Sequence, residues 1–164
     1  MNYARINFSD ISNGPGVRLS LFVSGCSHRC SGCFNQAAMK YDAGQLFTDK
    51  QKQQIIDGLS DPYISGLSIL GGEPLDPVNR DVVADLCNTV KSIYPNKTIW
   101  LWTGYELSDV YKCEALKYVD VVVDGPYIKG LPRLQWRGSS NQMVWHRSID
   151  GFVCCPEECV DSLE

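Results

Sequence analysis

Short apolar runs that end at glycine alternate along this chain with amphipathic segments, and this alternation constrains the fold most strongly. Four runs have the β-branched, aromatic and leucine content of buried strands: residues 19–24, 67–70, 98–103 and 119–123. Three segments have the apolar spacing of helices: residues 48–59, 79–94 and 108–118. Thr48 and Ser108 are the expected N-caps, and Pro95 stops the second helix.

The order of these segments, strand then helix, predicts an α/β fold in which helices pack on a parallel sheet. Right-handed crossovers would bring the carboxyl ends of the strands to one edge, where ligands bind in such folds. Four strands are too few for an eight-stranded barrel. We therefore expect a single α/β domain over residues 1–148, either a small incomplete (β/α) barrel or an open curved parallel sheet. A cysteine-containing tail follows at residues 149–164.

Three cysteines, Cys26, Cys30 and Cys33, follow the first predicted strand with the spacing C-x3-C-x2-C. Thiolates are soft ligands that suit zinc and iron–sulfur clusters. A structural zinc site and a ferredoxin cluster each normally use four protein ligands, whereas three cysteines on a 4Fe–4S cluster leave one iron open for chemistry. The alternatives are a zinc site with His28 as a fourth ligand, or unligated thiols.

This cysteine loop resembles that of the radical S-adenosylmethionine superfamily. In that superfamily the open iron binds the amino and carboxylate groups of the cofactor, and an electron cleaves the cofactor into methionine and a 5′-deoxyadenosyl radical. Many members have an aromatic residue before the third cysteine, where this chain has Gly32. The loop is similar to a subfamily with the sequence C-x-G-C-[FY]-N. The resemblance implies that Gly32, Cys33 and Phe34 contact the adenine; otherwise Phe34 is a packed core ring.

A Gly-Gly-Glu-Pro sequence after the second predicted strand is similar to another motif of the superfamily. By this resemblance, Gly72 lets the backbone approach the cofactor. Glu73 and a backbone carbonyl are natural acceptors for the cofactor's ammonium group. The pairs Thr103-Gly104 and Asp124-Gly125 end the next two strands. They either line the same pocket or form ordinary turns.

Three further sequences, DISNGPGVR, WLWTGY and WRGSSNQ, extend the resemblance from Met1 to about Gln142. With the two motifs above, they are similar to the activating proteins of anaerobic (class III) ribonucleoside-triphosphate reductases. The resemblance implies an enzyme that generates a glycyl radical on the reductase, with a flavodoxin or ferredoxin as electron donor. It also implies that Arg137 and Asn141 contact the cofactor or the reductase, unless Arg137 only pairs with a surface acid. Residues 13–16 and Arg18 would shape the entrance to the site.

The composition and charge of the chain narrow the classes of function that remain possible. The net charge is −4 and no stretch of the sequence is strongly basic, which argues against a nucleic-acid partner. The N-terminus lacks a signal peptide and no apolar run approaches 20 residues, so we expect a cytoplasmic protein without a membrane span. Two alternative functions stay open. One is a radical enzyme that acts on another glycyl radical enzyme or on a small molecule, and the other is a non-enzymatic module that binds zinc or a cluster.

The tail contains three more cysteines: Cys154, Cys155 and Cys159. Three ligands are one short of a structural zinc site, so we expect free thiols at an acidic chain end rather than a second metal site. Cys87 occupies an apolar position of the second predicted helix and is expected in the core. Cys113 has no evident partner, and His146 lies outside every motif and is expected to be structural.

Overall fold

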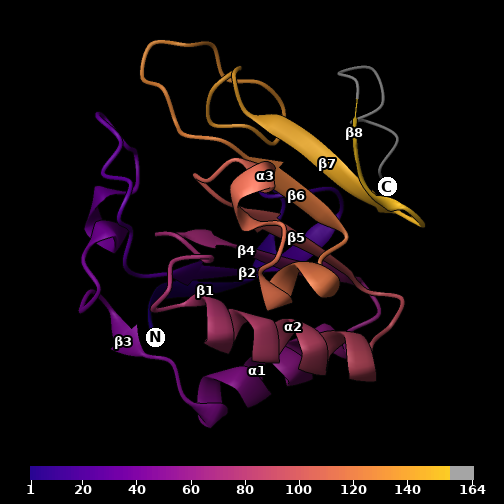
Figure 1. The fold of residues 1–164 in the computed structure, drawn as a ribbon. Coiled ribbons are helices and arrows are strands. Elements are labelled where there is room, and N and C mark those ends of the chain that lie inside the picture. Colours follow the sequence, from indigo (N-terminus) through magenta and orange to yellow (C-terminus); the bar gives the residue numbers. More distant parts are fainter. Residues whose placement is uncertain (156–164) are drawn as a thin grey trace.

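A computed structural model describes residues 1–155 of the 164-residue chain as one eight-stranded sheet carrying two main helices (Figure 1). The order of the strands in the sheet is β3-β1-β2-β4-β5-β6-β7-β8. The strands are β1 (Asn2–Asp10), β2 (Val17–Val23), β3 (Gln45–Leu46), β4 (Ile64–Gly71), β5 (Thr98–Trp102), β6 (Val121–Asp124), β7 (Met143–Ser148) and β8 (Gly151–Cys154). The α-helices are α1 (Asp49–Leu59), α2 (Arg80–Ile93) and α3 (Leu107–Val110), and the 3-10 helices are η1 (Gln36–Met39) and η2 (Glu114–Lys117).

The four predicted strands form the centre of this sheet. β2, β4, β5 and β6 pair in parallel, which confirms the α/β class. The expectation of a purely parallel sheet is wrong, because β1 and β7 pair antiparallel with the outer parallel strands, and β3 and β8 extend the sheet further. The sheet is open, with β3 and β8 at its edges. A small incomplete barrel is therefore not confirmed.

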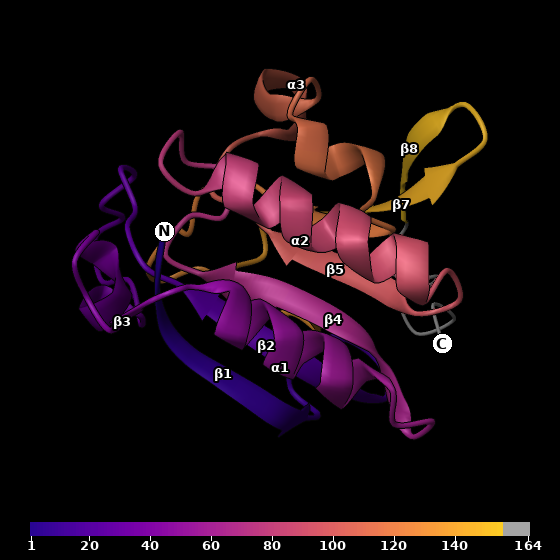
Figure 2. The same ribbon diagram turned by 90° about the horizontal axis from the view of Figure 1, so that it is seen from below.

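Two of the three predicted helices are present. α1 begins after Thr48, whose backbone N–H donates to the side chain of Gln51 in a capping box. α1 and α2 lie across the same face of the sheet (Figure 2). The predicted helix at 108–118 is wrong: α3 and η2 replace it, because the backbone at Cys113 is extended, with φ −62° and ψ 130°.

The central strands bury both of their faces. Leu19, Leu67 and Ile99 pack into the core beneath the helices, together with Cys87, which is fully buried as predicted. Side chains alternate across a strand, so the intervening positions face away from the helices. There, Trp100 belongs to a second, smaller apolar cluster. This second face is only partly covered, and it leads into the site described below.

A buried arginine crosses this second face. Arg18 is completely buried and donates hydrogen bonds to Ser68 Oγ (2.7 Å) and to the carbonyl oxygens of Leu67 (2.9 Å) and Thr98 (2.9 Å). Burial lowers the pKa of its guanidinium to about 10. Arg18 therefore joins β2, β4 and β5 from within the sheet, and its side chain is buried rather than placed at the entrance to the site.

Candidate active site

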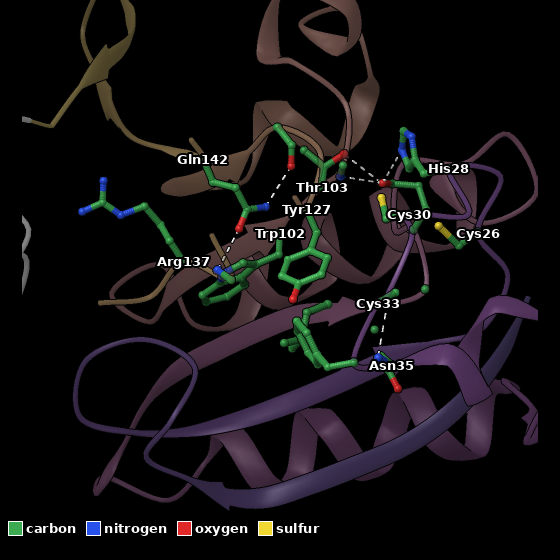
Figure 3. A pocket seen from close by; sticks show the side chains of 18 of the residues that line it. Cys26, His28, Cys30, Cys33, Asn35, Trp102, Thr103, Tyr127, Arg137 and Gln142 are labelled. Carbon is green, nitrogen blue, oxygen red and sulfur yellow. Dashed lines mark hydrogen bonds and ion pairs between the residues drawn. The ribbon is translucent and has the colours of Figure 1, made fainter. Parts of the chain in front are cut away.

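The three cysteines of the C-x3-C-x2-C sequence lie on the loop after β2, at the carboxyl edge of the parallel strands (Figure 3). Two backbone hydrogen bonds fix the start of this loop: Gly25 N–H donates to Ala38 O (2.8 Å), and Cys26 N–H donates to Met39 O (3.1 Å). All three thiols are free, partly exposed and directed to the same cavity.

The cavity has a volume of about 220 Å³. A water molecule needs only about 10–15 Å³ of such space, so the cavity accommodates a ligand of many atoms. The carboxyl ends of the neighbouring strands complete its wall with Gly71, Gly72, Thr103, Gly104 and Gly125. Thr103, Gly104 and Gly125 therefore line the pocket, which is one of the two alternatives that the sequence left open. Asp124 does not line it; its carboxylate accepts a hydrogen bond from Leu107 N–H (2.6 Å) at the start of α3.

The Gly-Gly-Glu loop lies directly against the cysteine loop. Glu73 N–H donates to Gly25 O (2.8 Å). A Cβ atom at Gly72 would lie 2.4 Å from that same oxygen, closer than any side chain can approach. Only glycine lets the two loops meet at this distance.

The carboxylate of Glu73 is buried, and protein groups surround it. Oε1 accepts from Thr103 Oγ1 (2.8 Å) and Leu75 N–H (2.9 Å), and Oε2 accepts from Gly104 N–H (2.8 Å). His28 Nε2 lies 2.9 Å from Oε2. A carboxylate has about four acceptor positions. In this arrangement four protein contacts therefore fill the hydrogen-bonding capacity of the Glu73 carboxylate. They come from the cysteine loop, the β4 loop and the end of β5.

His28 is thus a partner of Glu73. The hydrogen bond to Glu73 raises the pKa of its imidazole, and burial opposes this effect. Within residues 1–155, no three His, Cys, Asp or Glu side chains gather closely enough to hold one metal ion. The structure therefore does not assemble His28 and the cysteines as a single-ion zinc site.

The cysteines instead suit a larger inorganic group. Three soft donors on one cavity wall fit a 4Fe–4S cluster that keeps one iron open to a ligand in the cavity. Burial raises the pKa of the Cys26 thiol, and metal coordination overcomes this effect because the ligand is the thiolate. The residues present therefore fit the predicted cluster.

Phe34 lies at the mouth of the cavity. Its side chain is 73% exposed, so the alternative of a packed core ring is wrong. Its ring meets Tyr127 edge to face, with centroids 5.8 Å apart, and the guanidinium of Arg133 lies 6.0 Å from its centroid. Sequence analysis missed Tyr127 and Arg133. They belong to a loop without regular periodicity, and only the fold brings it to the cysteines.

The WRGSSNQ sequence closes the opposite wall. Trp136, Arg137 and Gln142 line the cavity. Gln142 holds the loop in place, because its side chain accepts from Gly138 N–H (2.7 Å) and donates to Gly125 O (2.8 Å). Asn141 does not line the cavity, and its side chain donates to Pro126 O (2.8 Å).

Cys154 and Cys155 of the tail do not line this cavity. Cys154 ends β8, and the thiol of Cys155 lies 2.9 Å from His146 Nδ1 on β7. This contact packs His146 on β7 against Cys155, the residue directly after β8. Cys159 lies outside the described residues, so a second metal site in the tail stays an untested alternative.

The site has free thiols on the loop after the first parallel strand, and a glycine-rich loop faces them across a cavity. These features are typical of α/β domains that carry an iron–sulfur cluster at the carboxyl edge of the sheet. Comparison with known families agrees with this class. The chain matches the family described as "4Fe-4S single cluster domain" over residues 12–145. No helix within residues 1–155 is long and apolar enough to cross a membrane.

Similarity to curated proteins identifies the family more closely. The chain is 49% identical over 146 residues to the anaerobic ribonucleoside-triphosphate reductase-activating protein of Enterobacteria phage T4, covering 88% of this chain and 94% of the relative. It is 45% identical over 153 residues to the protein of that name from Haemophilus influenzae, covering 90% and 98%. It is 43% identical over 152 residues to that of Escherichia coli, covering 89% and 99%. The chain therefore belongs to the family of anaerobic ribonucleoside-triphosphate reductase-activating proteins.

Proposed function

We propose that this chain activates an anaerobic (class III) ribonucleoside-triphosphate reductase by generating a glycyl radical on it, as a radical S-adenosylmethionine enzyme. The observation that carries the proposal is the cavity shared by Cys26, Cys30, Cys33 and the Gly72-Glu73 loop. Such a cavity would let a cluster with one open iron and an organic cofactor come into contact. Membership of the activating-protein family supports the reductase as the target.

When bound, a reduced 4Fe–4S cluster would supply one electron for the cleavage of S-adenosylmethionine, and this cleavage would supply the radical that takes a hydrogen atom from glycine. The chain positions these groups. Cys26, Cys30 and Cys33 bind the cluster as thiolates, and their three protons leave on binding. Cys33 and Phe34 line the cavity and form the wall against which the adenine would pack. Gly32, the third residue expected there, does not line the cavity and lies against the Lys129 side chain.

The Gly72-Glu73 loop orients the methionine part of the cofactor. The glycine leaves backbone atoms uncovered toward the cavity. Glu73 accepts the ammonium group directly only if one of its four present donors withdraws. His28 is the donor on the cysteine loop, and it is partly exposed, whereas the other three belong to the β4 loop and the end of β5. We therefore assign His28 as the group that turns away when the ammonium binds.

The far wall of the cavity excludes water from the reacting groups. Trp102 and Trp136 line it, and the indole N–H of Trp102 donates to the backbone oxygen of Trp136 (2.7 Å), which fixes the Trp102 side chain relative to the Trp136 backbone. Aromatic C–H bonds are strong, so these rings would offer a radical few hydrogen atoms to abstract. The cavity stays open at the Phe34 side, where a glycine segment of a protein substrate is able to enter.

Electron paramagnetic resonance tests this function. An anaerobic mixture of cluster-reconstituted protein, S-adenosylmethionine, a reductant and a purified anaerobic ribonucleotide reductase is expected to give a glycyl doublet that requires every component. Cys26→Ala, Cys30→Ala and Cys33→Ala should abolish the doublet and lower the iron content. Cys113→Ala is the matched control, because Cys113 lies outside the cavity.

The same mixture separates the alternatives. Formation of 5′-deoxyadenosine without a doublet would retain the radical chemistry and exclude this reductase, which would favour another glycyl radical enzyme or a small-molecule substrate. A loaded cluster that yields neither product would refute the proposed function.

A further inference from the structure

A second cleft lies on the other side of residues 125–128 from the cysteine cavity. Its volume is about 720 Å³, which is within the range of about 300–1,000 Å³ typical of small-molecule sites. Gly125 lines both spaces, whereas Tyr127 lines the cavity and its neighbours Pro126 and Ile128 line the cleft. The 125–128 segment therefore separates the two spaces, and the proposed function uses only the first.

The wall of the cleft is largely aromatic and apolar. Tyr111, Ile128 and Met143 line it with side chains that are 63%, 44% and 42% exposed. Trp145 lines it from a half-buried position on β7. Exposed apolar side chains that gather around a hollow are typical of a ligand site. Two aromatic rings and a thioether suit a flat aromatic ligand in particular.

Two polar atoms of residues in this wall lack hydrogen-bond partners. Trp145 Nε1 and Asn141 Oδ1 are buried, and neither has a partner among residues 1–155. The amide nitrogen of Asn141 donates to Pro126 O (2.8 Å), which fixes the side chain. Buried polar groups normally have partners, and a ligand that accepts from the indole N–H and donates to the amide oxygen would supply both. The edge of a nucleobase combines such acceptors and donors.

The charged groups of the cleft are acidic. Glu106 and Asp124 line it, and among the described residues no Lys, Arg or His does so. Lys112 does not line it, and its ammonium lies 5.4 Å from the centre of the Tyr111 ring. A carboxylate near a strand end is a typical acceptor for ribose hydroxyls, whereas phosphates bind best to cations. The lining therefore favours an uncharged nucleoside over a nucleotide.

We propose that this cleft binds an uncharged nucleoside. The base lies against the aromatic side chains and bonds to Trp145 Nε1 and Asn141 Oδ1, and the ribose hydroxyls donate to the two carboxylates. One such nucleoside, 5′-deoxyadenosine, is a product of the proposed reaction, formed when the deoxyadenosyl radical takes a hydrogen atom. The inference rests on the proposed function for this source of the ligand, and on the cleft for its chemistry. None of Cys26, Cys30 and Cys33 lines the cleft, so the glycine segment that reacts at the cluster has no role there.

Nuclear magnetic resonance of the cluster-free full chain tests the proposal, with 5′-deoxyadenosine as the probe. The chain has four tryptophans, and the indole N–H signals of Trp145 and Trp102 are identified by their loss in Trp145→Phe and Trp102→Phe. We expect the probe to move the Trp145 signal in a saturable titration, because this N–H gains an acceptor. The Trp102 signal reports on the cysteine cavity, since Trp102 lines that cavity and not the cleft.

A pair of tyrosine variants tests whether the cleft is the site. Tyr111→Ala removes a ring from the cleft, and Tyr63→Ala removes an equally exposed ring that does not line it. Loss of a stacking partner should weaken binding about tenfold in Tyr111→Ala, and Tyr63→Ala should bind the probe as wild type does. Both side chains are largely exposed, so neither change removes core packing. ATP should bind more weakly than the probe, because its phosphates meet the two carboxylates.

Four results would overturn the proposal. A probe that moves the Trp102 signal and leaves the Trp145 signal unchanged would lie in the cysteine cavity. Equal affinities in Tyr111→Ala and Tyr63→Ala would place it outside the cleft. Equal affinities for ATP and the probe would exclude selection for an uncharged ligand. A Trp145 signal that responds to purified reductase and not to the nucleoside would make the cleft a protein-binding surface.

The titration needs neither a cluster nor catalysis, so its outcome is separate from that of the proposed function. If no glycyl doublet forms but the Trp145 signal moves with the probe, the nucleoside site stands and only its source is refuted. If the doublet forms and the Trp145 signal does not move, only the nucleoside site is refuted.

Discussion

Asn79 should contribute more to the stability of the site than any exposed side chain near it. It is fully buried at the start of α2, and its side-chain amide donates to Ser24 O (3.0 Å) before the cysteine loop and to Glu73 O (2.9 Å) in the Gly-Gly-Glu loop. A third contact, to Gly25 O, is 3.5 Å long and contributes little. One side chain therefore links the two loops that face the cavity.

The cost of Asn79→Ala follows from these contacts. Each of the two short hydrogen bonds contributes a net stability of about 0.5–1.5 kcal/mol, and the void left by the amide adds roughly 1 kcal/mol. Asn79 Oδ1 has no hydrogen-bond partner within the described residues. Its removal therefore recovers part of the free energy that burying this oxygen costs, which makes the net loss of stability smaller. We expect a net loss of about 2 kcal/mol, which corresponds to a fall in Tm of roughly 4–8 °C for a domain of this size.

Urea unfolding of the cluster-free protein measures this loss directly. Asn88→Ala is the matched control, since it removes the same side chain from an exposed position of the same helix. Iron content after reconstitution should fall in Asn79→Ala and not in the control. A change in unfolding free energy below about 0.5 kcal/mol for Asn79→Ala would refute the reasoning, because it would mean that other contacts hold the loops.

Three further predictions concern neighbouring groups. Gly72→Ala should force the loops apart, because its Cβ would meet Gly25 O at 2.4 Å; iron retained at the wild-type level would contradict this. The pKa of His28 is raised in the folded state by its bond to Glu73, so its contribution to stability is complete below about pH 6.5 and disappears as the pH rises through the folded-state pKa. Urea unfolding of wild type and His28→Gln at pH 5.5 and 8.5 should therefore show the larger difference at the lower pH, and the reverse order would refute the assignment. Burial raises the pKa of Cys87 to about 12, so iodoacetamide followed by mass spectrometry should label Cys87 in urea and not in the folded protein.

The centre of the fold was predictable because its signals are local. Buried strands such as β4 are short, largely apolar runs, and α1 begins at a capping box. The outer strands lack such signals: β1 is polar and half exposed, with two register shifts against β2. Its pairing depends on the neighbouring strand rather than on its own sequence.

The site was predictable to a similar extent. The cysteine spacing and the Gly-Gly-Glu sequence identified both loops, because each is a short motif. The contacts of Phe34 with Tyr127 and Arg133 join positions about 95 residues apart, and no periodic pattern in the sequence predicts them. The filled hydrogen-bonding capacity of Glu73 was equally hidden, since three of its four donors come from other loops.

Polar side chains, rather than apolar packing, hold the working edge of this sheet together. Asn79 joins the cysteine loop to the Gly-Gly-Glu loop, Glu73 joins that loop to His28 and to the end of β5, and Gln142 joins the end of β6 to Gly138. Loop backbone groups near a cavity need hydrogen-bond partners that strands and helices no longer supply. Each of these buried side chains meets that need for two loops at once. These side chains preorganise the edge of the sheet around a cavity that stays open. A site that holds a cluster and a cofactor and still admits a segment of another protein needs both properties, a fixed edge and an open cavity.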